Sequence, residues 1–236
     1  MNERGHLSVQ VPATGASPAP PAPVGLQKLE LGSRRDSYIY VPPHYRPDQP
    51  MPLVVLLHGA GGHAHDGLRI LLHLADHAGL ILVAPASHAP TWDIIAGRTY
   101  GADLALVDRT LEHVFTHYAV DTDHLGIGGF SDGASYALTL GLANGNVFTH
   151  VLAFSPGFIG PIAQQGIPEV FVSHGDADRV LAIDGCGRKI ARELRAAGYP
   201  LLYREFQGGH EIPPDIAEDA IHWLLFTGKT SGEERN

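Results

Sequence analysis

Hydrophobic positions along the chain gather in short continuous runs, and between them apolar residues recur at helical spacing. Eight runs have the length of a strand: residues 26–31, 36–43, 52–59, 80–86, 124–130, 150–157, 169–175 and 200–206. The first two predict a pair of edge strands. The run PLVVLLHG at 52–59 is apolar throughout, which is typical of a strand that is covered on both faces of its sheet.

Two clear helical patterns lie in the segments between the runs. Apolar residues three and four apart extend from Leu104 to Tyr118 and again from Ile216 to Leu225. Strands that alternate with helices predict an α/β fold, with a mainly parallel central sheet and helices on both faces. In such sheets the functional groups gather at the carboxyl ends of the strands.

Length and composition favour one domain of ordinary α/β size. The 236 residues suit a single core, which we place at residues 26–228. Residues 1–25 contain the proline- and alanine-rich stretch PATGASPAPPAPVG and predict a flexible segment, and residues 229–236 predict a polar tail. The start of the chain has no apolar signal-peptide core and no run is long enough to span a membrane, so we expect a cytoplasmic protein.

The net charge limits which partners the protein can bind, and the cysteine content limits which disulfides it can form. Sixteen basic and twenty-five acidic residues give a net charge of −9, which argues against binding to nucleic acid or to an anionic membrane. The single cysteine, Cys186, rules out a disulfide within the chain. The sequence leaves the oligomeric state open.

The stretch GIGGFSDG at residues 126–133 could hold either a phosphate or a nucleophile. A phosphate-binding loop needs a lysine before serine or threonine, and no lysine occurs between Gly126 and Gly145. A dinucleotide fingerprint needs a glycine where Ser131 stands. The phosphate interpretation is therefore weak.

The nucleophile interpretation fits the surroundings of Ser131. Gly129 to Gly133 form G-x-S-x-G, directly after an apolar strand and before a helical run. A sharp strand-to-helix turn of this kind exposes the serine hydroxyl, and the residues two before and two after the serine crowd each other there. Glycine at both positions satisfies that requirement.

A serine nucleophile needs a base and an orienting acid. In α/β folds with a serine on such a turn, the acid follows the serine in the sequence and the histidine base follows the acid. The acid is expected just after the strand at 169–175, where Asp176 and Asp178 are both candidates. The base is expected after the strand at 200–206, where His210 stands. His222 is a weaker candidate, because it lies inside a helical run.

The oxyanion of an acyl-transfer reaction needs backbone amides near the nucleophile. The stretch LLHGAGG at 56–62 ends a central strand in a glycine-rich turn. We therefore expect the amides of Ala60 and Asp132 to form the oxyanion hole. His58 in the same turn is expected to make structural hydrogen bonds.

Four segments carry a family resemblance: PLVVLLHGAGG, GFSDGASYAL, HGDADRV and GGHEIP, within roughly residues 36–226. With these, the sequence resembles the α/β-hydrolases, and more narrowly the carboxylesterase/phospholipase-like and polyhydroxyalkanoate-depolymerase-like serine esterases. The family motif H-G-x-x-D-x-V assigns the acid to Asp178, and G-G-H assigns the base to His210. The resemblance implies an esterase or thioesterase without a cap domain and without a cofactor. Asp132 departs from the pattern, since related esterases often carry glutamine or methionine there.

Other side chains could shape or replace this site. Trp92 and Phe158 follow strands at the active edge and are candidates for the substrate pocket, although Trp92 could equally be a hydrophobic plug over the core. The chain has fifteen histidines, and His63, His65, His73 and His77 could suggest a metal site. No H-E-x-x-H motif or cysteine cluster accompanies them, so we expect no metal.

The sequence as a whole predicts a serine esterase. Ser131 would attack a carboxylic ester or thioester, His210 would take its proton, and Asp178 would orient His210. The short spacing from Ser131 to Asp178 leaves no room for a cap, which favours small or flexible ester substrates in an open site. The alternatives are a non-catalytic ligand-binding protein of the same fold, and a peptidase or amidase on the same triad.

Overall fold

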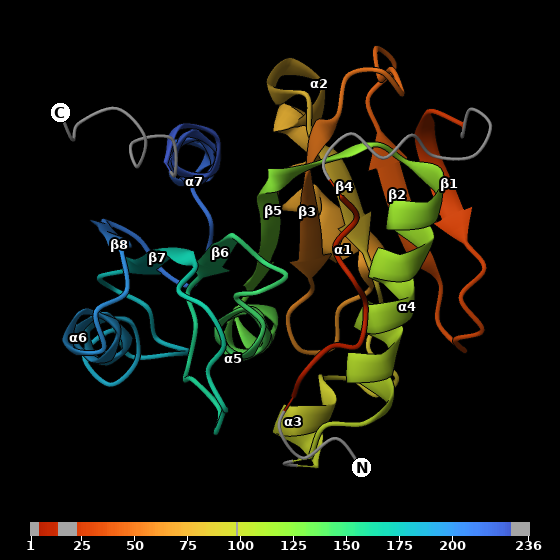
Figure 1. Ribbon diagram of the computed structural model, residues 1–236. Coiled ribbons are helices and arrows are strands. Elements are labelled where there is room, and N and C mark those ends of the chain that lie inside the picture. The colour runs from red at the N-terminus through yellow and green to blue at the C-terminus, as the bar shows by residue number, and fades with distance from the viewer. Residues whose placement is uncertain (1–4, 14–22, 98, 228–236) are drawn as a thin grey trace, which may run out of the picture.

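A single eight-stranded sheet runs through the protein (Figure 1). The computed structural model describes residues 5–13, 23–97 and 99–227. The strands are β1 (Gly25–Leu29), β2 (Ser37–Val41), β3 (Met51–Leu57), β4 (Ile81–Ala84), β5 (Val120–Phe130), β6 (His150–Phe154), β7 (Glu169–Gly175) and β8 (Leu201–Phe206). Their order across the sheet is β1-β2-β4-β3-β5-β6-β7-β8. Each of the eight predicted strands is confirmed.

Strand direction divides the sheet into an antiparallel edge and a parallel body. β1 pairs with β2, and β2 with β4, in antiparallel register, whereas every pairing from β4 through β3 to β8 is parallel. The carboxyl ends of β3, β5, β7 and β8 therefore meet at one edge of the sheet. The loops that follow these strands carry the predicted catalytic residues.

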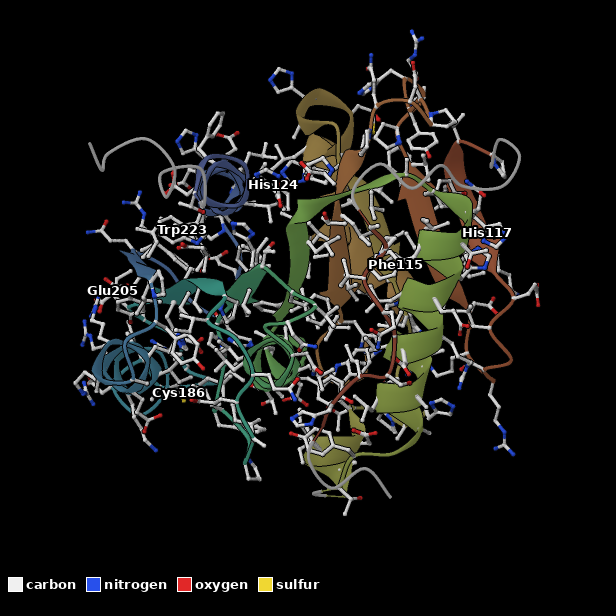
Figure 2. The ribbon with its side chains drawn as sticks, in the orientation of Figure 1. Phe115, His117, His124, Cys186, Glu205 and Trp223 are labelled. Carbon is white, nitrogen blue, oxygen red and sulfur yellow. The ribbon has the colours of Figure 1, made fainter. Side chains whose placement is uncertain are left out.

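Helices connect the parallel strands. They are α1 (Ala64–Arg69), the 3₁₀ turn η1 (Leu72–Leu74), α2 (Ala75–Ala78), α3 (Asp93–Ala96), α4 (Ala102–His117), α5 (Asp132–Ala143), α6 (Gly187–Ala196) and α7 (Pro214–Phe226). The two helices predicted from apolar spacing correspond to α4 and α7. Figure 2 shows Phe115 on the inner side of α4 and His117 on its outer side, as expected for an amphipathic helix.

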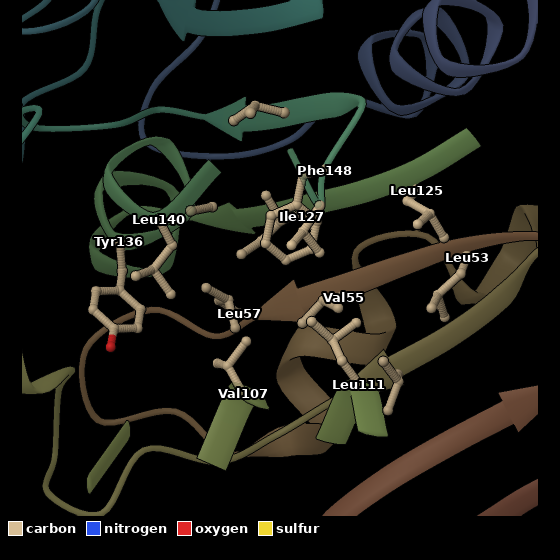
Figure 3. Packing of buried hydrophobic residues seen from close by; sticks show 14 of the residues in the cluster. Leu53, Val55, Leu57, Val107, Leu111, Leu125, Ile127, Tyr136, Leu140 and Phe148 are labelled. Atoms are coloured by element: carbon tan, nitrogen blue, oxygen red, sulfur yellow. The ribbon is translucent and has the colours of Figure 1, made fainter. Parts of the chain in front are cut away.

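Two hydrophobic cores, one on each face of the sheet, follow from the alternation of side chains along the strands. In β3, Val55 belongs to one core and Val54 and Leu56 to the other. The first core packs against α4, α5 and α6, and the second against α1, α2 and α7. Figure 3 shows the first core, where Val107 and Leu111 of α4 face the strands. A strand covered on both faces needs a continuous apolar run, which explains the pattern of residues 52–57.

Residues 5–13 differ from the flexible segment expected at 1–25. They run along α4 (Figure 1), and Leu7, Val9 and Val11 pack against the first core. The amides of Ser8 and Val9 both donate to the Asp108 carboxylate, at 2.9 and 2.8 Å. The alternating apolar residues, outside the proline-rich stretch, supply the burial that holds this segment. Residues 14–22 and the predicted tail at 229–236 lie outside the described residues.

The described chain folds without an inserted cap. The segment between β6 and β7, where the sequence left no room for a cap, contains neither helix nor strand. Within the described ranges, no helix has both the length and the apolar character needed to cross a membrane.

Candidate active site

Ser131 occupies the sharp turn between β5 and α5. Its backbone has φ 56° and ψ −118°, a conformation that non-glycine residues rarely adopt. The flanking glycines explain why the turn can be so tight. A Cβ on Gly129 would lie 2.5 Å from the carbonyl carbon of Gly133, and one on Gly133 would lie 2.1 Å from the carbonyl oxygen of Leu57. The G-x-S-x-G pattern is therefore a steric requirement of this turn.

A continuous chain of hydrogen bonds joins Ser131, His210 and Asp178. His210 Nε2 lies 2.9 Å from Ser131 Oγ, and His210 Nδ1 lies 2.6 Å from Asp178 Oδ2. Asp178 lies in the turn after β7 and His210 in the turn after β8, so the ends of β5, β7 and β8, with β6 between the first two, supply the three side chains. Only 14% of the His210 side chain is exposed, and none of the Asp178 side chain is. This geometry suits proton transfer from the serine to the imidazole.

The Asp178 carboxylate is held from two sides. Its Oδ2 faces His210, while its Oδ1 accepts hydrogen bonds from the amides of Val180 and Leu181, at 2.8 and 2.9 Å. Burial by itself would raise the pKa of Asp178, but the amide of Leu181, the His210 ring and the amide of Val180 outweigh it. The net pKa lies below the ordinary value, so the group remains an anion that can stabilise a charged imidazole.

The alternative acid and base residues lie elsewhere. Asp176 is exposed, and its Oδ1 accepts a hydrogen bond from the amide of Gly208 at 3.1 Å. It thus supports the turn that carries His210 but does not contact the imidazole. His222 lies on the exposed side of α7, with its ring against Phe226.

The glycine loop, residues 58–63, follows β3 and approaches the nucleophile. A Cβ on Gly59 would lie 3.5 Å from Ser131 Cβ, so the loop passes directly beside the serine. Ala60, the next residue, is exposed on this loop, and Asp132 is the first residue of α5. Amides in the first turn of a helix have no partner inside that helix and favour nearby negative charge. One predicted oxyanion donor, Ala60, thus follows the glycine that passes beside Ser131, and the other, Asp132, directly follows Ser131; their role as donors stays a prediction.

Trp92 is not a pocket residue, contrary to one of the two interpretations of its sequence position. Its side chain is fully buried, its ring stacks on Tyr136, and its Nε1 donates to the carbonyl of His58 over 2.9 Å. It is the hydrophobic plug that the sequence also allowed. Phe158 is 38% exposed on the loop after β6, and its place in a substrate pocket stays a prediction.

An open groove of about 330 Å³ lies beside His210. Its apolar lining comes from Ile70, Phe130, Ile212 and Ala217, with Asp66, Arg69, His73 and Glu211 among its polar residues. Phe130 also contacts the His210 ring, at 4.6 Å between centroids. A substrate bound with its carbonyl at Ser131 can therefore extend along a partly apolar surface.

His174 is a site residue that the sequence reasoning missed. It is fully buried, and its Nε2 lies 2.7 Å from the carbonyl oxygen of Leu181 and 3.2 Å from Asp178 Oδ2. Because both neighbours are acceptors, Nε2 carries the hydrogen. A Cβ on Gly187 would lie 2.8 Å from the ring, so glycine is required there. The signal was the first position of H-G-x-x-D-x-V, which precedes the acid by four residues.

The histidines considered as metal ligands do not gather around one point, and those described next contact different neighbours. His63 receives a hydrogen bond from Arg35, and His65 packs on the ring of Tyr38. Among the described residues, no group of three or more histidine, cysteine or acidic side chains could hold a metal ion. The expectation that the reaction uses no metal stays a prediction.

Comparison with known proteins shows which class of protein this chain is similar to. No family model matches the chain. A probable feruloyl esterase C of Aspergillus flavus is 28% identical and covers 91% of this chain and 90% of its own length. A feruloyl esterase C of Emericella nidulans is 26% identical, with coverage of 81% and 83%. The crystal structure of esterase PE8 aligns with a TM-score of 0.64 and 25% identity over 85% of this chain and 98% of its own.

The class follows from the fold, the site and these similarities. The sheet order, the strand-to-helix turn at Ser131 and the similarity to esterase PE8 make the chain an α/β-hydrolase. It is a serine esterase of that fold, as the sequence predicts, and ester hydrolysis is favoured over the ligand-binding and amidase alternatives.

Proposed function

We propose that the protein hydrolyses carboxylic esters through an acyl-enzyme on Ser131, with His210 as the base and Asp178 as the orienting acid. The observation that carries this proposal is the hydrogen-bonded chain from Ser131 Oγ through His210 to Asp178 Oδ2, at 2.9 and 2.6 Å. It stands on a turn whose backbone strain exposes the serine hydroxyl. Positioned nucleophile, base and acid are the parts that acyl transfer requires.

In the first half of the reaction, Ser131 Oγ attacks the ester carbon and its proton passes to His210 Nε2. The carbonyl oxygen becomes an oxyanion, which the amides of Ala60 and Asp132 stabilise. His210 then gives the proton to the leaving alcohol oxygen, and the acyl group remains on Ser131. The Asp178 anion stabilises the charged imidazole during these steps, in agreement with its lowered pKa.

In the second half, water takes the place of the alcohol. His210 accepts a proton from the water as it attacks the acyl carbon, and returns that proton to Ser131 Oγ when the acid leaves. The site is open enough for this exchange, because Ser131 and His210 are not completely buried and the groove beside His210 opens to solvent.

The substrate that fits this site best is an ester with a flat or short apolar group, and we propose aryl-acyl esters of the hydroxycinnamoyl kind. Two observations support this choice. The groove beside His210 is apolar along Ile70, Phe130, Ile212 and Ala217, and no cap closes it in the part of the chain that the structure describes. Two relatives that align over most of the chain are named feruloyl esterases.

The test compares wild type with Ser131→Ala on p-nitrophenyl acetate, p-nitrophenyl butyrate and methyl ferulate. We expect wild type to hydrolyse the esters and to be labelled covalently by a fluorophosphonate probe. Ser131→Ala should lose at least about 10³ in turnover and all labelling, with an unchanged circular dichroism spectrum. Near-wild-type turnover in Ser131→Ala would refute the nucleophile, while hydrolysis of acetate but not ferulate would refute only the aryl preference.

A further inference from the structure

Arg35 connects two loops at the active edge, although it lies far from the triad in the sequence. It stands between β1 and β2, and its guanidinium is half-buried. Its Nη1 donates to the carbonyl oxygens of Ser87 and Ala89, at 2.9 and 3.0 Å. Its Nη2 donates to the carbonyl oxygen of Gly62 and, at 2.7 Å, to Nδ1 of His63.

The two loops that Arg35 joins are the glycine loop and the loop of residues 85–92, which follows β4. The glycine loop is already fixed at its start, where Trp92 Nε1 donates to the carbonyl of His58 and the amide of Ser87 donates to His58 Nε2. In its middle, the amide of Gly61 donates to the carbonyl of Pro90 over 2.6 Å. Arg35 fastens the far end of the loop, so the loop that carries Ala60 is attached at its start, its middle and its end.

The composition of the glycine loop explains why it needs an external anchor. Three of its six residues are glycine, and Gly61 has φ 71° with no atom within 4 Å of a Cβ built there. Ala60 and Gly61 are both exposed, so the direction of the Ala60 amide depends on the backbone hydrogen bonds that hold the loop and not on side-chain packing. Glycine loses the most conformational freedom on ordering, and a pliable loop is a poor support for an oxyanion donor.

Arginine is suited to this task because its guanidinium is a rigid planar fork with five donors. The two arms point to different loops: Nη1 to residues 87–89 and Nη2 to residues 62–63. A lysine ammonium is a single point of charge, which cannot keep both sets of acceptors at hydrogen-bonding distance. A single side chain thus bridges the far ends of the two loops.

We propose that Arg35 is a positioning residue for the oxyanion hole: it holds the glycine loop so that the amide of Ala60 faces the oxyanion formed at Ser131. This inference rests on the proposed function. An oxyanion donor acts mainly in the transition state, so its displacement lowers kcat and leaves KM nearly unchanged. Complete removal of one such donor costs about 10²–10³ in kcat, and a loosened loop should cost part of that.

The experiment measures kcat and KM of Arg35→Ala, Arg35→Lys and the control Arg34→Ala on p-nitrophenyl butyrate. Arg34 is the exposed neighbour in the same connection and serves as the matched loss of one charge. We expect kcat to fall about 10–100-fold in Arg35→Ala and about 3–30-fold in Arg35→Lys, with KM within about threefold of wild type. Arg34→Ala should keep the wild-type kcat.

Two further measurements separate positioning from general stability. An arylboronic acid forms a tetrahedral adduct on the serine, and its affinity should fall in step with kcat/KM in the Arg35 variants. Added methylguanidinium should restore part of the kcat of Arg35→Ala and none in wild type or Arg34→Ala. Thermal unfolding midpoints give the fraction folded for each variant.

Several outcomes would overturn the proposal. The proposal is wrong if Arg35→Lys or folded Arg35→Ala keeps the wild-type kcat. It is also wrong if an Arg35 variant loses as much in KM as in kcat, or if its affinity for the arylboronic acid is unchanged. If Arg35→Ala does not fold, Arg35→Lys decides by the same criteria. Ser131→Ala is measured in the same assay. Full turnover in Ser131→Ala would refute the proposed function itself. If Ser131→Ala is inactive and Arg35→Lys keeps the wild-type kcat, only the role of Arg35 is refuted.

Discussion

Thr91 donates a hydrogen bond of 2.5 Å to the carboxylate of Asp132. Asp132 directly follows the nucleophile, and its amide is one of the two proposed oxyanion donors. A carboxylate on this residue could oppose the negative charge that forms on the substrate. The bond to Thr91 ties that carboxylate to the loop of residues 85–92, and a charge held by a hydrogen-bond donor repels a second anion less.

We predict that Thr91→Val lowers kcat about 3–10-fold, because the Asp132 carboxylate loses its donor and can turn towards the oxyanion. Asp132→Asn should change kcat less than about threefold, since its amide oxygen still accepts from Thr91. The double variant tests the cause. Thr91→Val should cost little kcat in the Asp132→Asn background, and an equal cost in both backgrounds would contradict this explanation.

The assignment of the acid predicts unequal effects for two neighbouring aspartates. Asp178→Asn should lower kcat by up to about 10⁴. The neutral side-chain amide of asparagine cannot stabilise the charged imidazole as the carboxylate does, and it favours the wrong tautomer of His210. Asp176→Asn should be mild, since the asparagine oxygen can still accept the hydrogen bond from the amide of Gly208. Turnover of p-nitrophenyl butyrate decides between them. A crippled Asp176→Asn with a mild Asp178→Asn would reverse the assignment.

The turn that presents Ser131 predicts a strong steric effect at Gly133. A Cβ there would lie 2.1 Å from the carbonyl oxygen of Leu57, so β3 or α5 must shift to admit it. Gly133→Ala should lower the free energy of unfolding by roughly 3 kcal/mol, measured by urea denaturation. Gly209→Ala is the matched control, because nothing lies within 4 Å of a Cβ at that position. Equal effects at both positions would refute the steric explanation.

A buried histidine at the opposite end of the sheet predicts a dependence of stability on pH. His150, at the start of β6, bonds to the hydroxyls of Thr149 and Thr227 and stacks on His124, which Figure 2 shows beside α7. Burial, and then repulsion from His124, lowers the pKa of His150 from 6.5 to about 4. The unfolded chain therefore binds a proton at a higher pH than the folded protein does.

The sign of the effect follows from that difference. The stability contributed by neutral His150 is complete above about pH 6.5 and is lost as the pH falls towards about 4. Between pH ~7.5 and pH ~5 this loss amounts to about 2 kcal/mol. In His150→Gln this position cannot titrate. Its free energy of unfolding, measured in urea, should therefore fall less than that of wild type over the same pH range, and the difference should equal the loss attributed to His150. The same fall in wild type and variant would contradict the prediction.

The sequence by itself determined the sheet and the order of the chemical groups along it. A strand buried on both faces is apolar along its length, so the central strands could be recognised from local runs, and β3 is the clearest of them. The outer strands β1, β2 and β8 are only partly buried and mix apolar with polar positions. The turn at Ser131 could be recognised because its sterics demand glycine two residues before and after. Asp178 and His210 each follow a strand end directly, and parallel strands bring those ends to one edge.

The tertiary structure alone decided which groups meet across long sequence distances. Trp92 could be a pocket residue or a plug, and only its stacking on Tyr136 and its bond to His58 made it a plug. Leu7 packs against the first core, and its amide donates to the side chain of Asn144, 137 positions away. Arg35 carries no local signal at all, since its partners lie up to 54 positions away. Such contacts depend on how loops fold back over one sheet edge, and spacing along the chain does not encode that.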